Sequence, residues 1–330
     1  MSVQPRRHAS FEPVLLLLAC LAITRNACAS EPVAFYPDWF PGTEFAGIYT
    51  AIDRGYYREA GLEVTLHPFA FGQKSHETIA AATDVCSLGS MEGYIFLQKR
   101  AAGADLQALG VVLQESPAGI MSLQRTGLTG AKDFAGKTIG MHKFADPVYH
   151  WLLRTAGLPE SGSRLVTVGN DLALLTNGQI DAMQGFASEE FVQLRQRVGD
   201  GARFLSFREL GFESYSEILF TTPAQLARHR DTLRLFLLAT RRGWIEALAH
   251  PDAAVESVAR RSGPASDRIF LLASLEALRP FVAPRNTIPL APMDPAKWAR
   301  VQATCVEIGF ISTVESVENF LGPDLISARP

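Results

Sequence analysis

The chain has 330 residues, of which 47 % are hydrophobic and 9 % aromatic, and its formal net charge at pH 7 is −3. This length is about that of two average domains and can bury a large core, so a stapled mini-protein and a disordered chain are both excluded. The near-neutral charge argues against nucleic acid and anionic membrane surfaces as main partners.

The N-terminal segment has the pattern of a secretory signal peptide. A basic start at 6–8 precedes an apolar run at 14–23, and Ala27-Cys28-Ala29 forms a small-x-small cleavage site. This run is too short to cross a membrane, which takes roughly 20 residues. We therefore predict cleavage after Ala29, giving a signal peptide at 1–29 and a mature protein in the periplasm. A lipoprotein signal that presents Cys20 for lipidation is the alternative.

Two of the four cysteines would remain after cleavage, Cys86 and Cys305. They lie far apart in the sequence, and neither has a partner at metal-ligand spacing, so no metal site is predicted. Each is expected to be a small buried apolar residue, and a disulfide between them stays open.

Short apolar runs alternate with amphipathic stretches up to about residue 222, which is the order of βα units. The first series predicts strands at 32–35, 62–66, 85–88 and 106–112 and helices at 44–53, 75–82 and 93–102. The pattern then restarts, with strands at 119–123, 137–141, 164–168, 181–186 and 217–221 and helices at 147–156, 171–177 and 189–198. Long helices follow at 224–250, 252–261, 266–279 and 295–308. This order predicts an α/β protein with two lobes, each built on a largely parallel sheet.

Sequence motifs for cofactor chemistry are absent. The seven histidines include no pair at metal-ligand spacing on one element, and the chain has no G-x-S-x-G, G-x-G-x-x-G or P-loop pattern. We therefore predict no cofactor.

The first candidate site follows the first predicted strand, where the carboxyl ends of parallel strands open onto a ligand crevice. Trp39 there offers a flat face for stacking a ring, and Asp38 offers a carboxylate that accepts hydrogen bonds from ring amines. A core role for Trp39 and a helix-capping role for Asp38 are the alternatives.

Two more candidate segments also lie between a strand and a helix. In Gly89-Ser90-Met91-Glu92-Gly93 small residues allow a ligand to approach backbone amides, and Tyr94 would add an aromatic wall; a plain serine-capped helix start is the alternative. In Ser188-Glu189-Glu190 the first glutamate suits a helix cap, so Glu190 is the better candidate for ligand contact.

These segments together resemble a family of ABC-importer substrate-binding proteins, the SsuA/THI5-like (NMT1/THI5) group. The resemblance rests on Asp-Trp-Phe-Pro-Gly-Thr at 38–43, Gly-Tyr-Tyr-Arg-Glu-Ala-Gly-Leu at 55–62, Ser-Pro-Ala-Gly-Ile-Met at 116–121 and Lys-Asp-Phe-Ala-Gly-Lys at 132–137, and it covers most of 33–250. The second of these is specific for the wider group, whereas Asp-Trp-x-Pro points to its thiamine-pyrimidine branch.

The resemblance implies a type II periplasmic-binding-protein fold, in which two α/β lobes joined by crossover strands close on a ligand. Lobe I would comprise 30–113 and 222–330, and lobe II 114–221. It implies a monomer that meets ABC permease and ATPase subunits. The ligand-binding residues expected from the motifs and the resemblance are Asp38, Trp39, Pro41, Glu44, Ser90, Met91, Tyr94, Ser116, Glu190 and Tyr215.

The sequence departs from the family pattern in two places. Gly42 stands where the pyrimidine branch usually carries asparagine, which bears on the ligand. The enzymes of the family, which make the thiamine pyrimidine, carry a cysteine-rich run where this chain has Glu-Ser-Tyr-Ser-Glu at 213–217, and Met91 and Ile95 fall about where the enzymes have a lysine and a histidine. We therefore expect no enzyme activity.

The resulting hypothesis is a periplasmic protein that captures a small aromatic heterocycle, a thiamine pyrimidine precursor of the hydroxymethylpyrimidine or formylaminopyrimidine type. Riboflavin or a sulfonate- or nitrate-like anion is the alternative ligand. A thiamine pyrimidine synthase and a sensor lobe for a membrane kinase are the alternatives of other classes.

Overall fold

The structure is a computed structural model, which describes residues 1, 30–263 and 266–327. The expected signal peptide, its cleavage site and Cys20 lie outside the described residues. Among the helices of the described part, none is both long and apolar enough to cross a membrane.

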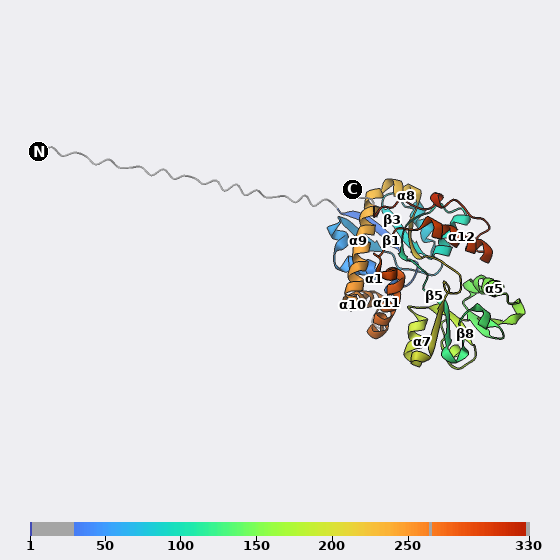
Figure 1. Ribbon diagram of the computed structural model, residues 1–330. Helices are drawn as coiled ribbons and strands as arrows, with labels where there is room; N and C mark the ends of the chain where they lie inside the picture. Colours follow the sequence, from blue (N-terminus) through green and yellow to red (C-terminus); the bar gives the residue numbers. More distant parts are fainter. Residues whose placement is uncertain (2–29, 264–265, 328–330) are drawn as a thin grey trace.

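Two five-stranded sheets form the centre of the molecule (Figure 1). The first sheet has the order β2-β1-β3-β10-β4. Its strands are β1 (Glu31–Tyr36), β2 (Leu62–Leu66), β3 (Cys86–Met91), β4 (Gln107–Leu113) and β10 (Ser216–Thr221). The second sheet has the order β7-β6-β8-β5-β9. Its strands are β5 (Ala118–Leu123), β6 (Thr138–Met141), β7 (Arg164–Thr167), β8 (Ala182–Phe186) and β9 (Ala202–Ser206).

Both sheets are mixed, which differs from the expected parallel arrangement. β1 runs parallel to β2 and β3, whereas β10 runs antiparallel to β3 and β4. In the second sheet β5 runs antiparallel to its neighbours β8 and β9. The pairing of β10 also places 216–221 in the first sheet, although the sequence assigns 114–221 to lobe II. When a strand follows a crossing between two sheets, its sequence does not indicate in which sheet it pairs.

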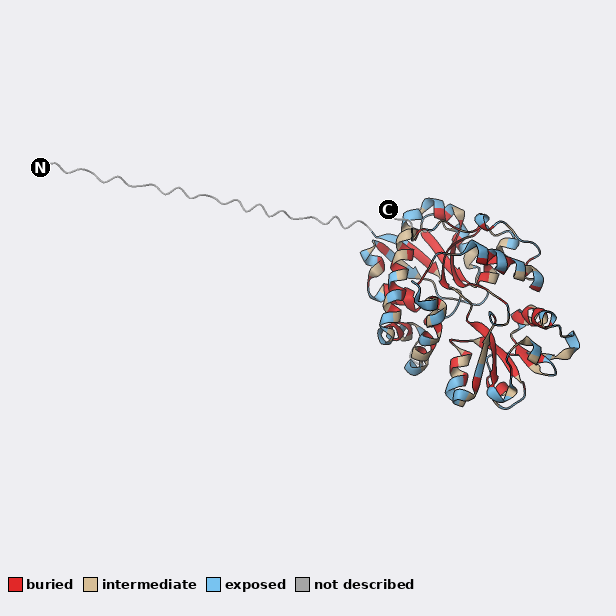
Figure 2. Ribbon diagram, in the orientation of Figure 1, coloured by how far each residue is buried: buried red, intermediate tan, exposed pale blue. Residues whose placement is uncertain are grey.

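Helices cover both faces of the first sheet, and its strands are buried along most of their length (Figure 2). The helices from the two ends of the chain are α1 (Ala46–Asp53), α2 (Tyr56–Glu59), α3 (Ser75–Ala81), α4 (Gly93–Ala101), α8 (Pro223–Arg228), α9 (Arg230–Ala249), α10 (Pro251–Ser262), α11 (Arg268–Val282) and α12 (Pro295–Ile308). Their apolar faces and the strands form one core with Phe35, Phe236 and Trp244 and another with Phe96 and Trp298.

The crossing of α1 and α9 depends on two glycines. A Cβ at Gly47 would overlap the Trp244 ring, and one at Gly243 would overlap the carbonyl oxygen of Gly47. The two backbones therefore approach one another more closely than side chains would permit, which joins an N-terminal and a C-terminal segment in one core.

The second sheet is covered by α5 (Asp146–Thr155), α6 (Ala173–Thr176) and α7 (Glu190–Val198). Helix α12, which belongs to the first core, also contacts α5: the Trp151 indole donates to Glu307 Oε2 at 2.9 Å, and Ile308 joins the core of the second sheet. The two sheets are thus linked by a helix contact as well as by the chain crossings.

Two local expectations are corrected. β9 was not predicted; it is a short strand with a single buried residue, and it forms an edge beside β5. The helix expected at 224–250 is interrupted at His229, whose backbone is not helical (φ −121°, ψ 31°).

The expectation that both cysteines are buried is confirmed. Cys86 and Cys305 are free thiols in separate cores, and burial raises the pKa of each to about 12.

Candidate functional site

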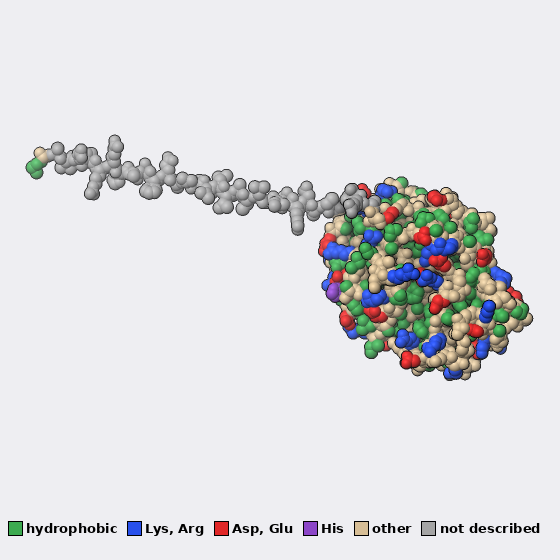
Figure 3. All heavy atoms as spheres, in the orientation of Figure 1, with side chains coloured by type: hydrophobic (Ala, Val, Ile, Leu, Met, Phe, Trp, Pro, Cys, Tyr) green, Lys and Arg blue, Asp and Glu red, His purple; other side chains and the backbone are tan. Residues whose placement is uncertain are grey.

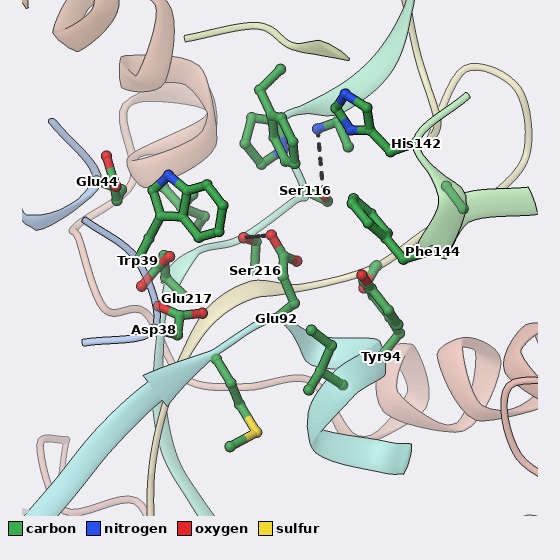
Figure 4. Close-up of a pocket in the computed structure, with 18 of the residues that line it drawn as sticks. Asp38, Trp39, Glu44, Glu92, Tyr94, Ser116, His142, Phe144, Ser216 and Glu217 are labelled. Atoms are coloured by element: carbon green, nitrogen blue, oxygen red, sulfur yellow. Dashed lines mark hydrogen bonds between the residues drawn. The ribbon is translucent and has the colours of Figure 1, made fainter. Parts of the chain in front are cut away.

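A cavity of about 870 Å³ lies between the two sheets and takes its lining from both. Figure 4 shows Asp38, Trp39, Glu44, Glu92 and Glu217 gathered from the first sheet and its loops, with His142 and Phe144 facing them from the second. This volume lies in the range of pockets that bind small molecules.

Asp38 follows the end of β1 and is held by Ser90 at the end of β3. The Ser90 hydroxyl donates to Asp38 Oδ1 at 2.6 Å, and the Asp38 N–H donates to Ser90 Oγ at 3.2 Å. Burial raises the pKa of the Asp38 carboxyl, and the hydrogen bond from Ser90 opposes that rise. Asp38 is therefore a fixed carboxyl group in the cavity and not a helix cap.

Glu44 occupies the short helical turn before α1. A Cβ at position 42 would overlap the Glu44 carboxylate, so Gly42 makes room for the side chain to fold back toward the cavity. Burial, together with the charge of Glu189 from the second sheet, raises the pKa of Glu44 to about 8. The departure from the family pattern at residue 42 thus lies directly against a carboxyl group of the cavity.

Glu92 lies between β3 and α4. Its Oε1 accepts a hydrogen bond from the Ser216 hydroxyl at 2.7 Å, whereas its buried Oε2 has no partner among the described residues. Burial is the main cause that raises the pKa of Glu92 to about 8. A ligand donor would satisfy the unpaired oxygen.

Glu217 lies within β10 and is buried, with 7 % of its surface exposed. Its φ of 52° is in the left-handed region, which is strained for a residue other than glycine and costs about 1–3 kcal/mol. Burial, and then the charges of Asp38, Glu44 and Glu92, raise its pKa well above the usual range. Asp38, Glu44, Glu92 and Glu217 are called the carboxyl cluster below.

The second sheet contributes a wall of different chemistry. His142 follows β6, and its backbone N–H donates to Gln184 Oε1 at 3.1 Å; its buried Nε2 has no partner among the described residues. The Phe144 ring lies beside the imidazole with 5.5 Å between ring centroids, and it is 54 % exposed. This wall offers an aromatic ring and one free imidazole nitrogen to a ligand.

The structure reverses the expected order of Glu189 and Glu190 as candidates for ligand contact. Glu190 Oε2 accepts from the Phe186 N–H at 2.9 Å, so its carboxylate is bound to the backbone of its own loop. Burial and the charge of Glu190 raise the pKa of Glu189 to about 7, and the charge of Glu189 reaches Glu44 across the cavity. Glu189 is the better placed of the two to meet a ligand.

Aromatic rings line the first-sheet side of the cavity. Trp39 is 49 % exposed and packs on Phe69 with ring centroids 5.4 Å apart, and the exposed rings of Phe40 and Phe71 contact both. Trp39 is therefore not a core residue, and its indole is accessible for stacking. On α4 the Tyr94 ring stacks on Phe310 at 4.9 Å, which fixes it as a wall of the cavity.

Of the ten candidates, the structure places Asp38, Trp39, Glu44, Ser90, Met91, Tyr94, Ser116 and Glu190 in the cavity lining. Their contact with a ligand stays a prediction. Pro41 is outside the lining and accepts a hydrogen bond from Ser262 through its carbonyl oxygen. Tyr215 is a core residue, 1 % exposed, that packs against Trp298 and accepts from the Asp294 N–H. These two positions were wrong because sequence proximity to a site does not give side-chain direction.

Sequence reasoning missed Glu92, Glu217, His142 and Phe144. Glu92 lies in the Gly89–Gly93 segment that the motif search selected, and a carboxylate between a buried strand and a helix was the available signal. Glu217 gave a stronger one, since it interrupts the apolar strand Ile218–Thr221 at its start. His142 and Phe144 follow a short strand in a loop that has no distinctive pattern.

Two mixed α/β lobes with a cavity between them are the architecture of the periplasmic-binding-protein fold, and solved structures agree. The periplasmic aliphatic sulphonate binding protein SsuA from Escherichia coli has a TM-score of 0.68 and 14 % identity to this chain, over 88 % of this chain and 97 % of that one. This likeness concerns the fold alone, and it confirms the expected two-lobed architecture.

The chain belongs to the NMT1/THI5 like family, which matches residues 42–254. Riboflavin-binding protein RibY of Chloroflexus aurantiacus is 24 % identical over 74 % of this chain and 74 % of its own. The formylaminopyrimidine-binding protein of Halalkalibacterium halodurans is 26 % identical over 74 % of this chain and 77 % of its own. The resemblance read from the sequence is thereby confirmed.

The comparisons correct the expectation that enzyme activity is absent. A relative from Legionella pneumophila, 23 % identical over 66 % of this chain and 70 % of its own, is named 4-amino-5-hydroxymethyl-2-methylpyrimidine phosphate synthase. Several further relatives carry the same name at similar identity. The expectation was wrong because it took differences at three places, 213–217, Met91 and Ile95, as enough to set this chain apart from the enzymes of the family.

Proposed function

We propose that this protein is a periplasmic solute-binding protein that captures an amine-bearing aromatic heterocycle, a thiamine pyrimidine precursor, and delivers it to an ABC permease with its ATPase. The carboxyl cluster beside Trp39 carries the proposal. Ring amines are hydrogen-bond donors, and the cavity offers them several carboxyl oxygens together with a flat ring for stacking.

The charge of the cavity supports a donor-rich ligand over an anion. Six carboxyl groups line it, and Lys99 supplies the single Lys or Arg side chain in the lining formed by the described residues. A sulfonate or nitrate would meet carboxyl oxygens where it needs donors. By contrast, Asp38 and Glu92 can each accept from an exocyclic amine, and a protonated neighbour such as Glu44 can donate to a ring nitrogen.

Two relatives add support for the ligand class, since one is named for formylaminopyrimidine and the other for riboflavin. Both ligands contain a nitrogen heterocycle that could stack on Trp39. Riboflavin is the second candidate because a cavity of about 870 Å³ exceeds what one six-membered ring fills.

Delivery to a permease is proposed together with closure of the two lobes over the ligand, lobe I being 30–113 with 216–330, because β10 pairs in the first sheet, and lobe II 114–215. Here the first-sheet residues would bind the ring and the second-sheet residues would cover it. Basic and acidic side chains are interspersed on the face shown in Figure 3.

Calorimetric titration of the mature protein tests the proposal, with 4-amino-5-hydroxymethyl-2-methylpyrimidine, formylaminopyrimidine and riboflavin as the titrants. We expect binding of at least one pyrimidine with a dissociation constant in the micromolar range or below. Absence of both heat and thermal stabilisation with both pyrimidines would remove the pyrimidine claim. Mass spectrometry of ligand released from the purified protein gives an independent reading.

A further inference from the structure

One side chain in the cavity has the opposite charge to all the carboxyl groups. Lys99 lies near the end of α4 and is partly buried, and no carboxylate of a described residue lies within 4 Å of its ammonium. The other lysine near this part of the cavity, Lys74, pairs with Glu77 at 2.8 Å. Lys99 is thus a positive charge without a carboxylate partner among the described residues, in the lining of a cavity that the proposed function uses for amines.

The geometry of α4 separates Lys99 from the carboxyl cluster. Glu92 precedes the first turn of the helix, and the lining residues Tyr94, Ile95, Gln98 and Lys99 recur at helical spacing, so one face of α4 forms a wall of the cavity. Lys99 is seven positions after Glu92 along the helix, a rise of about 10 Å at roughly 1.5 Å per residue. The two charges therefore occupy opposite ends of one wall.

Polar groups surround the Lys99 end. His76 and Ser75 of α3 line the cavity there with Gln98. Burial, and then the charge of Lys99, lower the pKa of His76, so the ammonium lies within electrostatic range of the imidazole. A neutral imidazole, a hydroxyl, an amide and an ammonium all supply hydrogen-bond donors. Gln73 is already engaged, because its Nε2 donates to the Pro37 carbonyl oxygen at 2.9 Å.

From this arrangement we propose that the cavity contains a second subsite, formed by His76, Gln98 and Lys99, which binds an anionic group of the ligand about 10 Å from the amine-bearing ring. The inference rests on the proposed function, since it assumes that the ring binds at the carboxyl cluster. The natural ligand would then be a bipolar molecule: a flat ring with an amine at one end and a phosphate or carboxylate at the other.

The two ends are electrostatically compatible. Burial holds Glu44 and Glu92 largely protonated near neutral pH, so an anion at the far end of the wall is not opposed by a full set of negative charges. An ammonium donating to a phosphate oxygen forms a charge-assisted hydrogen bond, the stronger kind. The size of the cavity accommodates both groups and a linker between them.

The test compares thiamine with thiamine monophosphate, which share an aminopyrimidine and differ by an anionic group at the distal end. We expect the monophosphate to bind the mature protein about tenfold more tightly than thiamine. In the Lys99→Gln variant this ratio should fall to about one. The matched control is Lys132→Gln, an exposed lysine outside the cavity, in which the ratio should stay at about ten.

Equal affinity of the two compounds for the unmodified protein would overturn the inference, and so would an unchanged ratio in Lys99→Gln. If 4-amino-5-hydroxymethyl-2-methylpyrimidine binds while the monophosphate shows no advantage, the proposed function stands and the second subsite fails. If none of the three compounds and no formylaminopyrimidine binds, both proposals fail. Thermal unfolding of each variant confirms that the comparison is made on folded protein.

Discussion

The two walls of the cavity differ in chemistry although both come from mixed sheets flanked by helices. The first-sheet wall holds the carboxyl cluster, whose members are fixed by Ser90, Ser216 and the space left by Gly42. The second-sheet wall presents Phe144 and an imidazole, and of its two glutamates one is bound to backbone. The first-sheet wall therefore carries most of the groups that would recognise the polar atoms of a ligand, and the second-sheet wall would mainly cover the ligand.

Because of this difference, one lobe can rotate relative to the other while the carboxyl groups keep their positions relative to one another. If every polar contact were shared between the walls, a small rotation of one lobe would break all of them. A site whose carboxyl groups are fixed relative to one another keeps its recognition geometry before closure and needs the second wall only to exclude water. Four experiments test whether polar recognition is confined to the first-sheet wall.

The largest effect is expected from Glu92→Gln. This change replaces the carboxyl group whose Oε2 is unpaired by an amide, so a ring donor that meets the amide nitrogen loses its acceptor. A buried hydrogen-bonding group left unpaired costs about 1–3 kcal/mol, so pyrimidine affinity should fall about 10- to 100-fold. The comparison variant is Glu189→Gln on the opposite wall, for which we expect a loss below tenfold. Calorimetry on both variants checks the pair, and equal losses would mean that recognition is shared.

Trp39→Ala should weaken binding by about tenfold, because aromatic pairs contribute about 0.5–1.5 kcal/mol beyond the area they bury. Phe71→Ala is the control, since this ring is 75 % exposed and contacts Trp39 but is outside the cavity lining. Its affinity should stay within twofold. Quenching of tryptophan fluorescence by the ligand gives a second measurement. An equal loss of affinity in Phe71→Ala would show that the neighbouring aromatic rings act together and that Trp39 does not act alone.

Phe144→Ala should cost less, about two- to fivefold in affinity, since the ring covers the ligand without polar contact. The loss is expected in the dissociation rate, because a covering group acts after the ring has bound. Stopped-flow measurement separates the two rates. A slower association with unchanged dissociation would show that Phe144 guides entry.

The smallest effect concerns pH. Because burial raises the pKa of Glu44 and Glu92 to about 8 from an ordinary value near 4.5, the folded protein holds more protons than the unfolded chain between these values. Stability of the ligand-free protein should therefore fall as pH rises through that window. We expect a lower melting temperature at pH 8.5 than at pH 5, and a flatter profile in Glu92→Gln.

A melting temperature that rises with pH over the same range would contradict this assignment. Glu189→Gln should flatten the profile only up to about pH 7, where the Glu189 carboxyl itself titrates. The carboxyl groups of the two walls would then lower the stability of the folded protein over different ranges of pH.

Much of the fold could be predicted from sequence, because period and turn residues are local. The strand Leu62–Leu66 alternates buried and exposed residues, and helix α12 begins after the capping Asp294, so both were placed at their observed limits. The pairing of β10 and the existence of β9 depend on which distant strand is the neighbour, and no local pattern gives that.

The site was only partly predictable for the same reason. Asp38 and Trp39 follow a strand directly, so the rule for parallel sheets places them at the crevice. Glu217 lies at the same cavity because β10 follows the second sheet in the chain and pairs in the first. Lys99 lies there because α4 begins beside Glu92. The direction of Tyr215 depends on Trp298, which is contributed by a helix near the C-terminus.

The contact of Gly47 with Gly243 has a consequence for sequence divergence and for chimeras. Neither glycine has room to become a larger residue unless the helix opposite shifts, so these two positions, far apart in the chain, should vary together among relatives. A hybrid that exchanges only α1 or only α9 with that of a relative would bring mismatched surfaces into contact. A hybrid that exchanges both helices keeps the crossing intact.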